Sequence, residues 1–194
     1  MKIHSICVYC ASSSKIDPIF FNHAIQLGEL MAQNQLTCVN GAGHQGLMAS
    51  LTESIIAHKG HVKGIIPRFM QEEGWCHPQI KDLILTDTMH ERKKLMAEHA
   101  DAFIAMPGGC GTMEELLEII TWRQLGLYNR PIVILNTKGY YDPLIQMLQM
   151  AIDETFMRPE HGAIWKVVDT PEEAIKWLQS IDQPLQDMRK MAAI

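Results

Sequence analysis

Residues 101–115, DAFIAMPGGCGTMEE, combine three features in one short stretch. Residues 101–106 are apolar and β-favouring, residues 107–111 are rich in glycine, and a helix is expected over 112–125. A strand that passes through a tight turn directly into a helix is the repeating unit of parallel α/β sheets. The stretch therefore predicts an α/β fold, with a glycine-lined loop at the carboxyl end of one strand.

The same alternation of strand and helix continues on both sides of this stretch. The other expected strands cover residues 3–10, 36–40, 62–66, 83–86, 131–136 and 164–168. The other expected helices start at Asp17-Pro18 and cover residues 45–58, 89–99, 143–156 and 171–181, while residues 67–80 are expected to be irregular. About seven strands in this pattern predict a Rossmann-like, doubly wound parallel sheet with helices on both faces. We expect a single domain over residues 1–182 and a C-terminal tail over 183–194.

The composition is that of a globular chain without a nucleic-acid or membrane partner. The 194 residues include 17 Lys+Arg and 22 Asp+Glu, for a net charge of -5, and 47% are hydrophobic. The longest basic run is residues 92–94, too short for the clustered positive charge that binds a phosphate backbone. The apolar stretches are far shorter than the roughly 20 residues that cross a membrane, and the N-terminus lacks the apolar region of a signal peptide.

Cysteine and histidine usage bears on compartment and on metal binding. The five cysteines, at positions 7, 10, 38, 76 and 110, form an odd set without a paired C-x-x-C framework, which fits a reducing compartment. The histidines show no paired ligand spacing such as H-E-x-x-H. We therefore expect a cytoplasmic protein that needs neither a metal nor another cofactor.

The first of two glycine-rich loops, residues 41–46, reads GAGHQG and matches the dinucleotide pattern G-x-G-x-x-G. That fingerprint also needs an acidic residue about 20 positions further on, to hold the ribose hydroxyls. Arg68 follows the next expected strand instead, so NADP, with its 2′-phosphate on Arg68, remains one alternative. The other is that these glycines only allow tight packing beside a neighbouring ligand.

The second loop, residues 107–112, joins an expected strand to a helix N-terminus. Its glycines let the backbone approach a ligand and turn N–H groups toward it, and the helix end adds partial positive charge. A phosphate fits such a loop. Because no Lys-Ser/Thr pair follows Gly111, this is not a Walker A loop, and a monophosphate is the simpler ligand.

Charged residues follow at two helix starts. Thr112 and Glu115 have the spacing of a capping box, so Glu115 is either a cap or a carboxylate aimed at the ligand. Thr88 and Glu91 repeat this spacing, and Arg92 comes next. If the strands at 83–86 and 101–106 lie near each other, Arg92 and Glu115 can approach one ligand; otherwise Arg92 belongs to a solvated basic helix face.

Five segments together resemble one known family. Residues 107–115 resemble the PGGxGTxxE motif of the LONELY GUY family, and residues 89–93, MHERK, resemble its second signature. Residues 10–13, 121–126 (TWRQLG) and 136–141 (NTKGYY) extend the likeness, in order, over nearly the whole chain.

The resemblance implies a Rossmann-like fold and a homodimer or higher homo-oligomer. It implies hydrolysis of the N-glycosidic bond of a nucleoside 5′-monophosphate, a small molecule, to free base and ribose 5-phosphate. Arg92 and Glu115 would be catalytic. The substrate-binding residues would be Ser12, Met89, Lys93, Gly108, Gly109, Gly111, Thr112 and Thr121. A further glutamate, Glu72 or Glu73, is left open.

The chain departs from the family pattern at three places. Ala42 interrupts a run of three glycines, Ala11 stands where glycine is common, and Arg123 replaces a small residue. These differences leave the preferred base undetermined. A second class of function is a non-catalytic nucleotide or cofactor carrier of the same fold, similar to the molybdenum-cofactor carriers, which would have no need of the Arg92 and Glu115 pair. Nothing in the sequence supports the lysine decarboxylase label that such proteins once carried.

Overall fold

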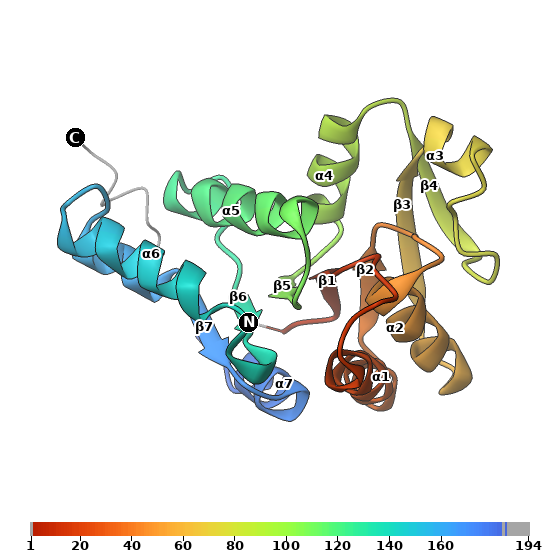
Figure 1. Cartoon of the computed structure of the whole chain (residues 1–194), viewed down its shortest axis with the longest axis horizontal. Helices are drawn as coiled ribbons and strands as arrows, with labels where there is room; N and C mark the ends of the chain where they lie inside the picture. The colour runs from red at the N-terminus through yellow and green to blue at the C-terminus, as the bar shows by residue number, and fades with distance from the viewer. Residues whose placement is uncertain (1, 184, 186–194) are drawn as a thin grey trace.

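A computed structural model describes residues 2–183 and 185 and contains one seven-stranded sheet (Figure 1). The strands are β1 Ser5–Tyr9, β2 Thr37–Asn40, β3 Val62–Pro67, β4 Asp82–Thr86, β5 Ala102–Ala105, β6 Ile132–Leu135 and β7 Trp165–Val168. All neighbours are parallel, in the order β4-β3-β2-β1-β5-β6-β7. The expected fold class is confirmed. Most of the expected tail, residues 184 and 186–194, lies outside the described residues.

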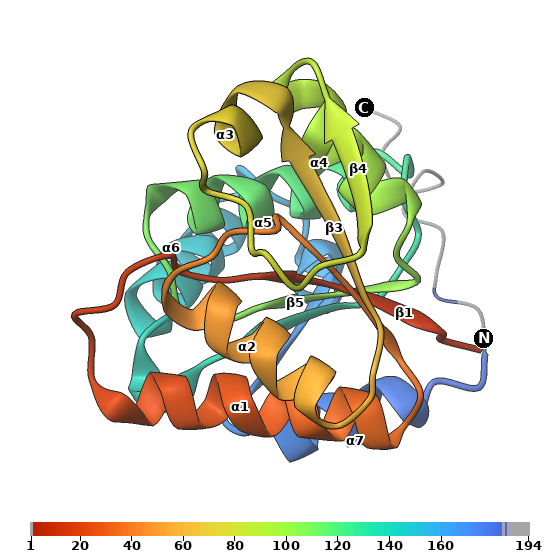
Figure 2. The same ribbon diagram turned by 90° about the vertical axis from the view of Figure 1, so that its right-hand side faces the viewer.

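Helices form a layer on each face of the sheet, as Figures 1 and 2 show. One layer holds α1 Pro18–Gln33, α2 Gly46–Ala57 and α7 Pro171–Gln179, and the other holds α4 Met89–Glu98, α5 Cys110–Gln124 and α6 Asp142–Asp153. A short helix, α3 Arg68–Glu72, follows β3, so the expectation of a wholly irregular segment 67–80 was wrong. Two 3-10 turns, η1 Thr137–Gly139 and η2 Pro159–Ala163, complete the elements.

The two layers are separated by strands that are apolar on both faces. In β1, Ile6 and Val8 pack into the core beneath α1 and α2, while Cys7 and Tyr9 pack beneath α4 and α5. This alternation follows from the two-residue period of a strand. Strands buried on both sides need apolar residues at every position, which is why β1 shows a continuous apolar run.

The start of α5 differs from the expectation and removes one interpretation of Glu115. The helix begins at Cys110, with Gly109 as its N-cap, rather than at Thr112. Thr112 therefore lies within the first turn and Glu115 more than one turn inside, so Glu115 does not close a capping box. At α4, by contrast, Thr88 is the N-cap, and its Oγ1 accepts a hydrogen bond from the Glu91 N–H at 3.1 Å.

The strand order fixes where a ligand would lie. The chain runs outward from β1 to β4, then returns to place β5 beside β1 and continues outward to β7. Loops that leave β1 and β5 at their carboxyl ends therefore diverge to opposite sides and open a crevice between them. These two loops contain Ser12 and Gly109.

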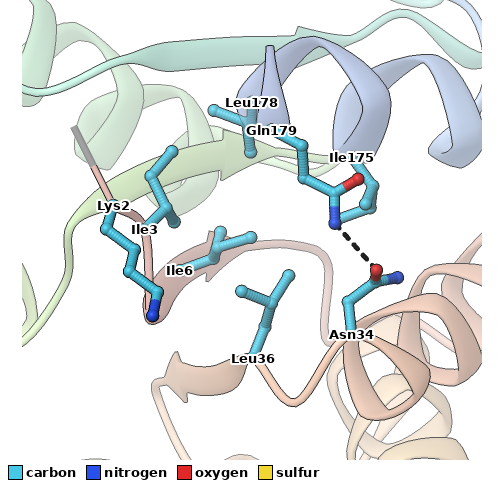
Figure 3. A pocket seen from close by; sticks show the side chains of 8 residues that line it. All are labelled: Lys2, Ile3, Ile6, Asn34, Leu36, Ile175, Leu178 and Gln179. Carbon is cyan, nitrogen blue, oxygen red and sulfur yellow. Dashed lines mark hydrogen bonds between the residues drawn. The ribbon is translucent and has the colours of Figure 1, made fainter. Parts of the chain in front are cut away.

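A small cavity lies at the amino ends of the strands, at the end of the sheet opposite to this crevice (Figure 3). It measures about 170 Å³ and is lined mostly by aliphatic side chains of β1, of α7 and of the segment before β2. Its polar side chains include Gln179, which donates a hydrogen bond to Asn34 at 2.7 Å (Figure 3). In the described part of the chain, no helix has the length and apolar character needed to cross a membrane.

Candidate active site

A cavity of about 460 Å³ lies beyond the carboxyl ends of the central strands, at the crevice between β1 and β5. Loops after β1, β2, β3 and β5 contribute to it, together with α4 and α5. Seven residues expected at the site line this cavity: Ser12, Met89, Arg92, Gly109, Gly111, Thr112 and Glu115. Three others, Gly108, Lys93 and Thr121, lie outside its lining.

Arg92 is buried, with 6% of its surface exposed, and its guanidinium is held by three acceptors. Nε donates to the carbonyl of Ile65 at 3.1 Å, Nη2 to the carbonyl of Gly41 at 3.4 Å and Nη1 to Oε1 of Glu115 at 3.5 Å. A Cβ at Gly41 would lie 1.8 Å from Nη2, so only glycine leaves room for the guanidinium. Arg92 is therefore not part of a solvated helix face, and Gly41 allows close packing of a side chain.

Arg92 and Glu115 meet even though the strands that precede them are not neighbours. Three strands, β3, β2 and β1, separate β4 from β5, so the two side chains meet without the strand proximity that the sequence analysis gave as the condition for it. Helix α4 instead runs back over the sheet, packs against β3 and ends beside α5 (Figure 1). Its N-terminal turn thereby brings Arg92 toward the centre of the sheet.

The Glu115 carboxyl is nearly enclosed, with 13% of its side chain exposed. Burial raises its pKa from the ordinary value of 4.5 to about 7, because the charged form loses its hydration. The positive charge of Arg92 opposes this rise, and the neighbouring charge of Glu114 adds to it. A carboxyl group that titrates near neutral pH inside a cavity is suited to exchange protons during a reaction.

Lys93 joins α4 to α5 behind the cavity. Its Nζ forms ion pairs with Glu114 and, at 3.0 Å, with Glu118, and 9% of the side chain is exposed. Burial lowers the pKa of Lys93, but the bonds to the two glutamates outweigh this and hold the pKa above its usual value. The structure therefore places Lys93 in contact with glutamates of α5 rather than at the cavity wall.

The glycine loop before α5 presents its backbone to the cavity. The first intrahelical hydrogen bond runs from the Met113 N–H to the Gly109 carbonyl at 3.0 Å, so the preceding N–H groups of the turn have no intrahelical partner. Thr112 packs over Gly108, where an added Cβ would lie 2.1 Å from the Thr112 Oγ1. This helix N-terminus can hold a phosphate or another anion.

The other glycine loop is tied to the segment that follows α3. Ala42, the departure from a triple glycine, has a left-handed φ of 57°. Its carbonyl accepts a hydrogen bond from the His77 N–H at 2.8 Å, and the His44 N–H donates to the Trp75 carbonyl at 3.1 Å. These bonds hold Trp75 at the cavity.

An apolar wall that the sequence analysis missed faces this loop. Met48, Met70 and Trp75 line the cavity together with the expected Met89. In the sequence, the residue that could have indicated this wall was Trp75, a large apolar side chain within a segment expected to be irregular.

Several other candidates lie away from the cavity. Arg68 is exposed, pairs with Asp87 at 3.0 Å and does not line the cavity. Glu72 and Glu73 are exposed around the end of α3, outside the lining. Thr121 is exposed on α5 and donates its hydroxyl to the Leu117 carbonyl at 2.8 Å.

Of the three departures from the family pattern, two lie at the cavity. Ala11 lines it, and Ala42 shapes the adjoining loop. Arg123 is buried elsewhere, where it donates to the Ile164 carbonyl and burial lowers its pKa to about 10. Among the described residues, no group of three His, Cys, Asp or Glu is arranged to hold a metal ion.

Comparison with known proteins identifies the family. The family described as "Possible lysine decarboxylase" matches residues 48–178. A cytokinin riboside 5′-monophosphate phosphoribohydrolase of Arabidopsis thaliana, LOG5, is 37% identical over 186 residues, which are 96% of this chain and 81% of the relative. A second, LOG2 of the same plant, is 40% identical over 156 residues, covering 80% and 73%. The chain belongs to the LONELY GUY family.

Solved structures of similar fold include a molybdenum cofactor binding protein from Rippkaea orientalis. Its TM-score is 0.70 at 21% identity, over 94% of this chain and 99% of that one. A molybdenum cofactor carrier protein from Chlamydomonas reinhardtii gives a TM-score of 0.69 at 16% identity, over 90% and 96%. At such identities the likeness shows the Rossmann-like fold, which this LONELY GUY family member shares with carriers.

The raised pKa of Glu115 predicts how stability depends on pH. Between pH 4.5 and about 7 the folded chain keeps a proton that the unfolded chain releases, so this group lowers the free energy of unfolding as pH rises. Glu115→Gln stays neutral, and we expect it to be more stable than the wild type at pH 8, by on the order of 3 kcal/mol. Urea denaturation of both proteins at pH 5 and pH 8 measures this. A variant less stable than the wild type at pH 8 would contradict it.

Proposed function

We propose that this protein hydrolyses the N-glycosidic bond of a nucleoside 5′-monophosphate, a cytokinin riboside 5′-monophosphate or AMP, to free base and ribose 5-phosphate. The observation that carries the proposal is the buried pair of Arg92 and Glu115, 3.5 Å apart, beside a glycine-lined helix N-terminus in one cavity. The names of the Arabidopsis relatives, at 37% and 40% identity, support the same activity.

The chemistry follows from the charge that develops during bond cleavage. Breaking the C1′–N bond gives the ribose oxocarbenium character, which a nearby carboxylate stabilises. Glu115 fills this role, and its carboxylate accepts a proton from the attacking water while the water oxygen bonds to C1′. The base leaves with the electron pair of the C1′–N bond and takes up a proton from solvent water, to which Glu115 in turn releases its own. A pKa of about 7 leaves a large share of Glu115 ionised at neutral pH. Arg92 favours that ionised form, and it fixes the ribose 5-phosphate group at its sugar.

The two ends of the cavity suit the two ends of a nucleotide. The N-terminus of α5, with Gly109, Gly111 and Thr112, binds the 5′-phosphate and anchors the substrate away from the reacting bond. The apolar wall formed by Met48, Met70, Trp75 and Met89 accepts the base and an apolar substituent on it. Glu115 and Arg92 also line this cavity and act on the sugar.

A carrier function is the alternative, and the buried carboxyl of Glu115 argues against it. An ionised carboxylate next to an anion site repels the anion, and its burial disfavours the charged form. A carrier would gain neither affinity nor stability from it. An N-glycosidase needs such a group at the sugar, so the arrangement favours the enzyme.

The exposed face of α5 supports a homodimer. Met113, Leu117, Thr121 and Trp122 line an open hollow on this helix, and Leu125 beyond its end is exposed. An apolar surface of this kind is typical of a contact between subunits.

We also place the protein in the cytoplasm, in keeping with five cysteines that are all free.

The substrate class is tested by comparing AMP and isopentenyladenosine 5′-monophosphate with adenosine. Loss of the charge-assisted hydrogen bonds at the α5 N-terminus removes binding energy from the transition state, so kcat/KM for adenosine should be lower by about 10²-fold or more. Chromatography of the released base measures it. Equal kcat/KM for adenosine and AMP would overturn the proposed phosphate site, and no release from any nucleotide would overturn the activity.

The role of Glu115 is tested by the Glu115→Gln variant. Loss of the ionisable group should lower kcat for AMP by about 10²-fold or more, and wild-type activity should decline as pH falls through about 7, where Glu115 takes up its proton. Glu118→Gln, the same change one turn along α5, is the control and should keep kcat within a few-fold. Full turnover by Glu115→Gln would remove the central residue of the mechanism.

The dimer is tested by Leu117→Arg, which places a charge in the α5 hollow. Light scattering coupled to size exclusion should show a dimer for the wild type and a monomer for the variant, because an unpaired charge is costly in an apolar contact. Met150→Arg, at an exposed methionine of α6, is the matched control and should stay dimeric. A monomeric wild type would exclude the proposed assembly.

A further inference from the structure

Three successive carbonyl groups of the loop after β5 accept hydrogen bonds from groups outside that loop. The Met106 carbonyl accepts from the Tyr141 hydroxyl at 2.7 Å, and the Pro107 carbonyl accepts from the Ala11 N–H at 3.2 Å. The Gly108 carbonyl accepts from the Tyr140 hydroxyl at 2.6 Å. Each peptide group between residues 106 and 109 is thus fixed by a donor on its carbonyl side.

Fixing a carbonyl also fixes the N–H group that follows it. A peptide unit is planar, and in the trans form its C=O and N–H bonds point in opposite directions. No cis peptide bond occurs among the described residues. The bond from Tyr140 to the Gly108 carbonyl therefore sets the direction of the Gly109 N–H, which points away from Tyr140. Gly109 lines the cavity, whereas Tyr140 does not.

The segment 136–141, which the proposed chemistry does not use, holds both tyrosines in place. Asn136 accepts the Tyr141 N–H at 2.7 Å through its side-chain oxygen and donates through its side-chain nitrogen to Asp142 at 2.7 Å. The Tyr140 ring makes edge contacts with the rings of Phe20 at 6.0 Å and Tyr141 at 5.1 Å. Because these contacts involve the rings and not the hydroxyls, a phenylalanine at either position keeps them.

We propose that Tyr140 is a positioning residue for phosphate binding: its hydroxyl orients the Gly108–Gly109 peptide so that the Gly109 N–H faces the cavity. The inference rests on the proposed function for the identity of the ligand, a ribose 5-phosphate group. Without the hydroxyl, the peptide is free to rotate, and part of the binding energy is spent on restoring its orientation.

Tyr141 provides a control built into the same loop. Its hydroxyl makes an equivalent bond to a carbonyl two residues earlier, at Met106. The residue after Met106 is Pro107, which has no N–H group, so this bond directs no donor toward a ligand. Tyr141→Phe therefore removes the same kind of hydrogen bond from the same loop without altering a phosphate donor.

The test measures dissociation constants of ribose 5-phosphate and inorganic phosphate by calorimetry for the wild type, Tyr140→Phe and Tyr141→Phe. Tyr140→Phe should weaken both ligands about five- to tenfold, the usual effect of losing one oriented hydrogen bond. Tyr141→Phe should bind within about twofold of the wild type yet melt at a lower temperature, because a buried carbonyl loses its donor. In turnover of AMP, Tyr140→Phe should raise KM by the same factor and leave kcat within about threefold.

Three results would overturn the proposal. The first is Tyr140→Phe binding both ligands as the wild type does, and the second is Tyr141→Phe weakening them equally. The third is a wild type that binds neither ligand. Failure of the proposed function is separate, because it would appear as absent AMP hydrolysis while the dissociation constants still report on Tyr140.

Discussion

The buried guanidinium of Arg92 is the contact on which the rest of the site depends. It joins β3 through Ile65, the loop after β2 through Gly41, and α5 through Glu115. Such a charge is stable inside a protein only when its donors are satisfied, so three separate parts of the chain must hold their positions together. This requirement explains the glycine at position 41, where any side chain would occupy the place of the guanidinium.

The charged side chains of α4 and α5 form two groups, one of which is the pair of Arg92 and Glu115. Arg92 lies beside Glu115 within the cavity, and Lys93, the next residue, pairs with Glu114 at the rim and with Glu118 outside the lining. Adjacent helix positions point in different directions, so two neighbouring cations serve separate partners. Burial keeps the pKa of Glu115 near 7 in spite of Arg92, whereas Glu114 at the rim is half exposed. In the proposed function, the site thus concentrates its proton chemistry on one carboxyl group.

In the proposed function, the cavity binds the two parts of a nucleotide with two different kinds of group. Its proposed anion-binding end consists of backbone N–H groups at the α5 N-terminus, and its other end consists of methionine side chains and Trp75. Backbone donors recognise a phosphate without distinguishing bases, while methionines adapt to apolar shapes. Under the proposed function, recognition of the common part and of the variable part of a nucleotide is therefore assigned to different elements.

The sequence by itself determined the alternation of strands and helices, the parallel class of the sheet, the loops that carry Ser12 and Gly109 and the helices that carry Arg92 and Glu115, because local periodicity, glycine turns and family motifs encode them. It did not determine that α5 starts at Cys110, that three strands separate β4 from β5, or that α3 holds part of the apolar wall. The placement of Lys93 behind the cavity and the bonds from Tyr140 and Tyr141 were equally hidden. Each of these features depends on contacts between residues far apart in the chain, and only the packing of helices on the twisted sheet decides which of those residues meet.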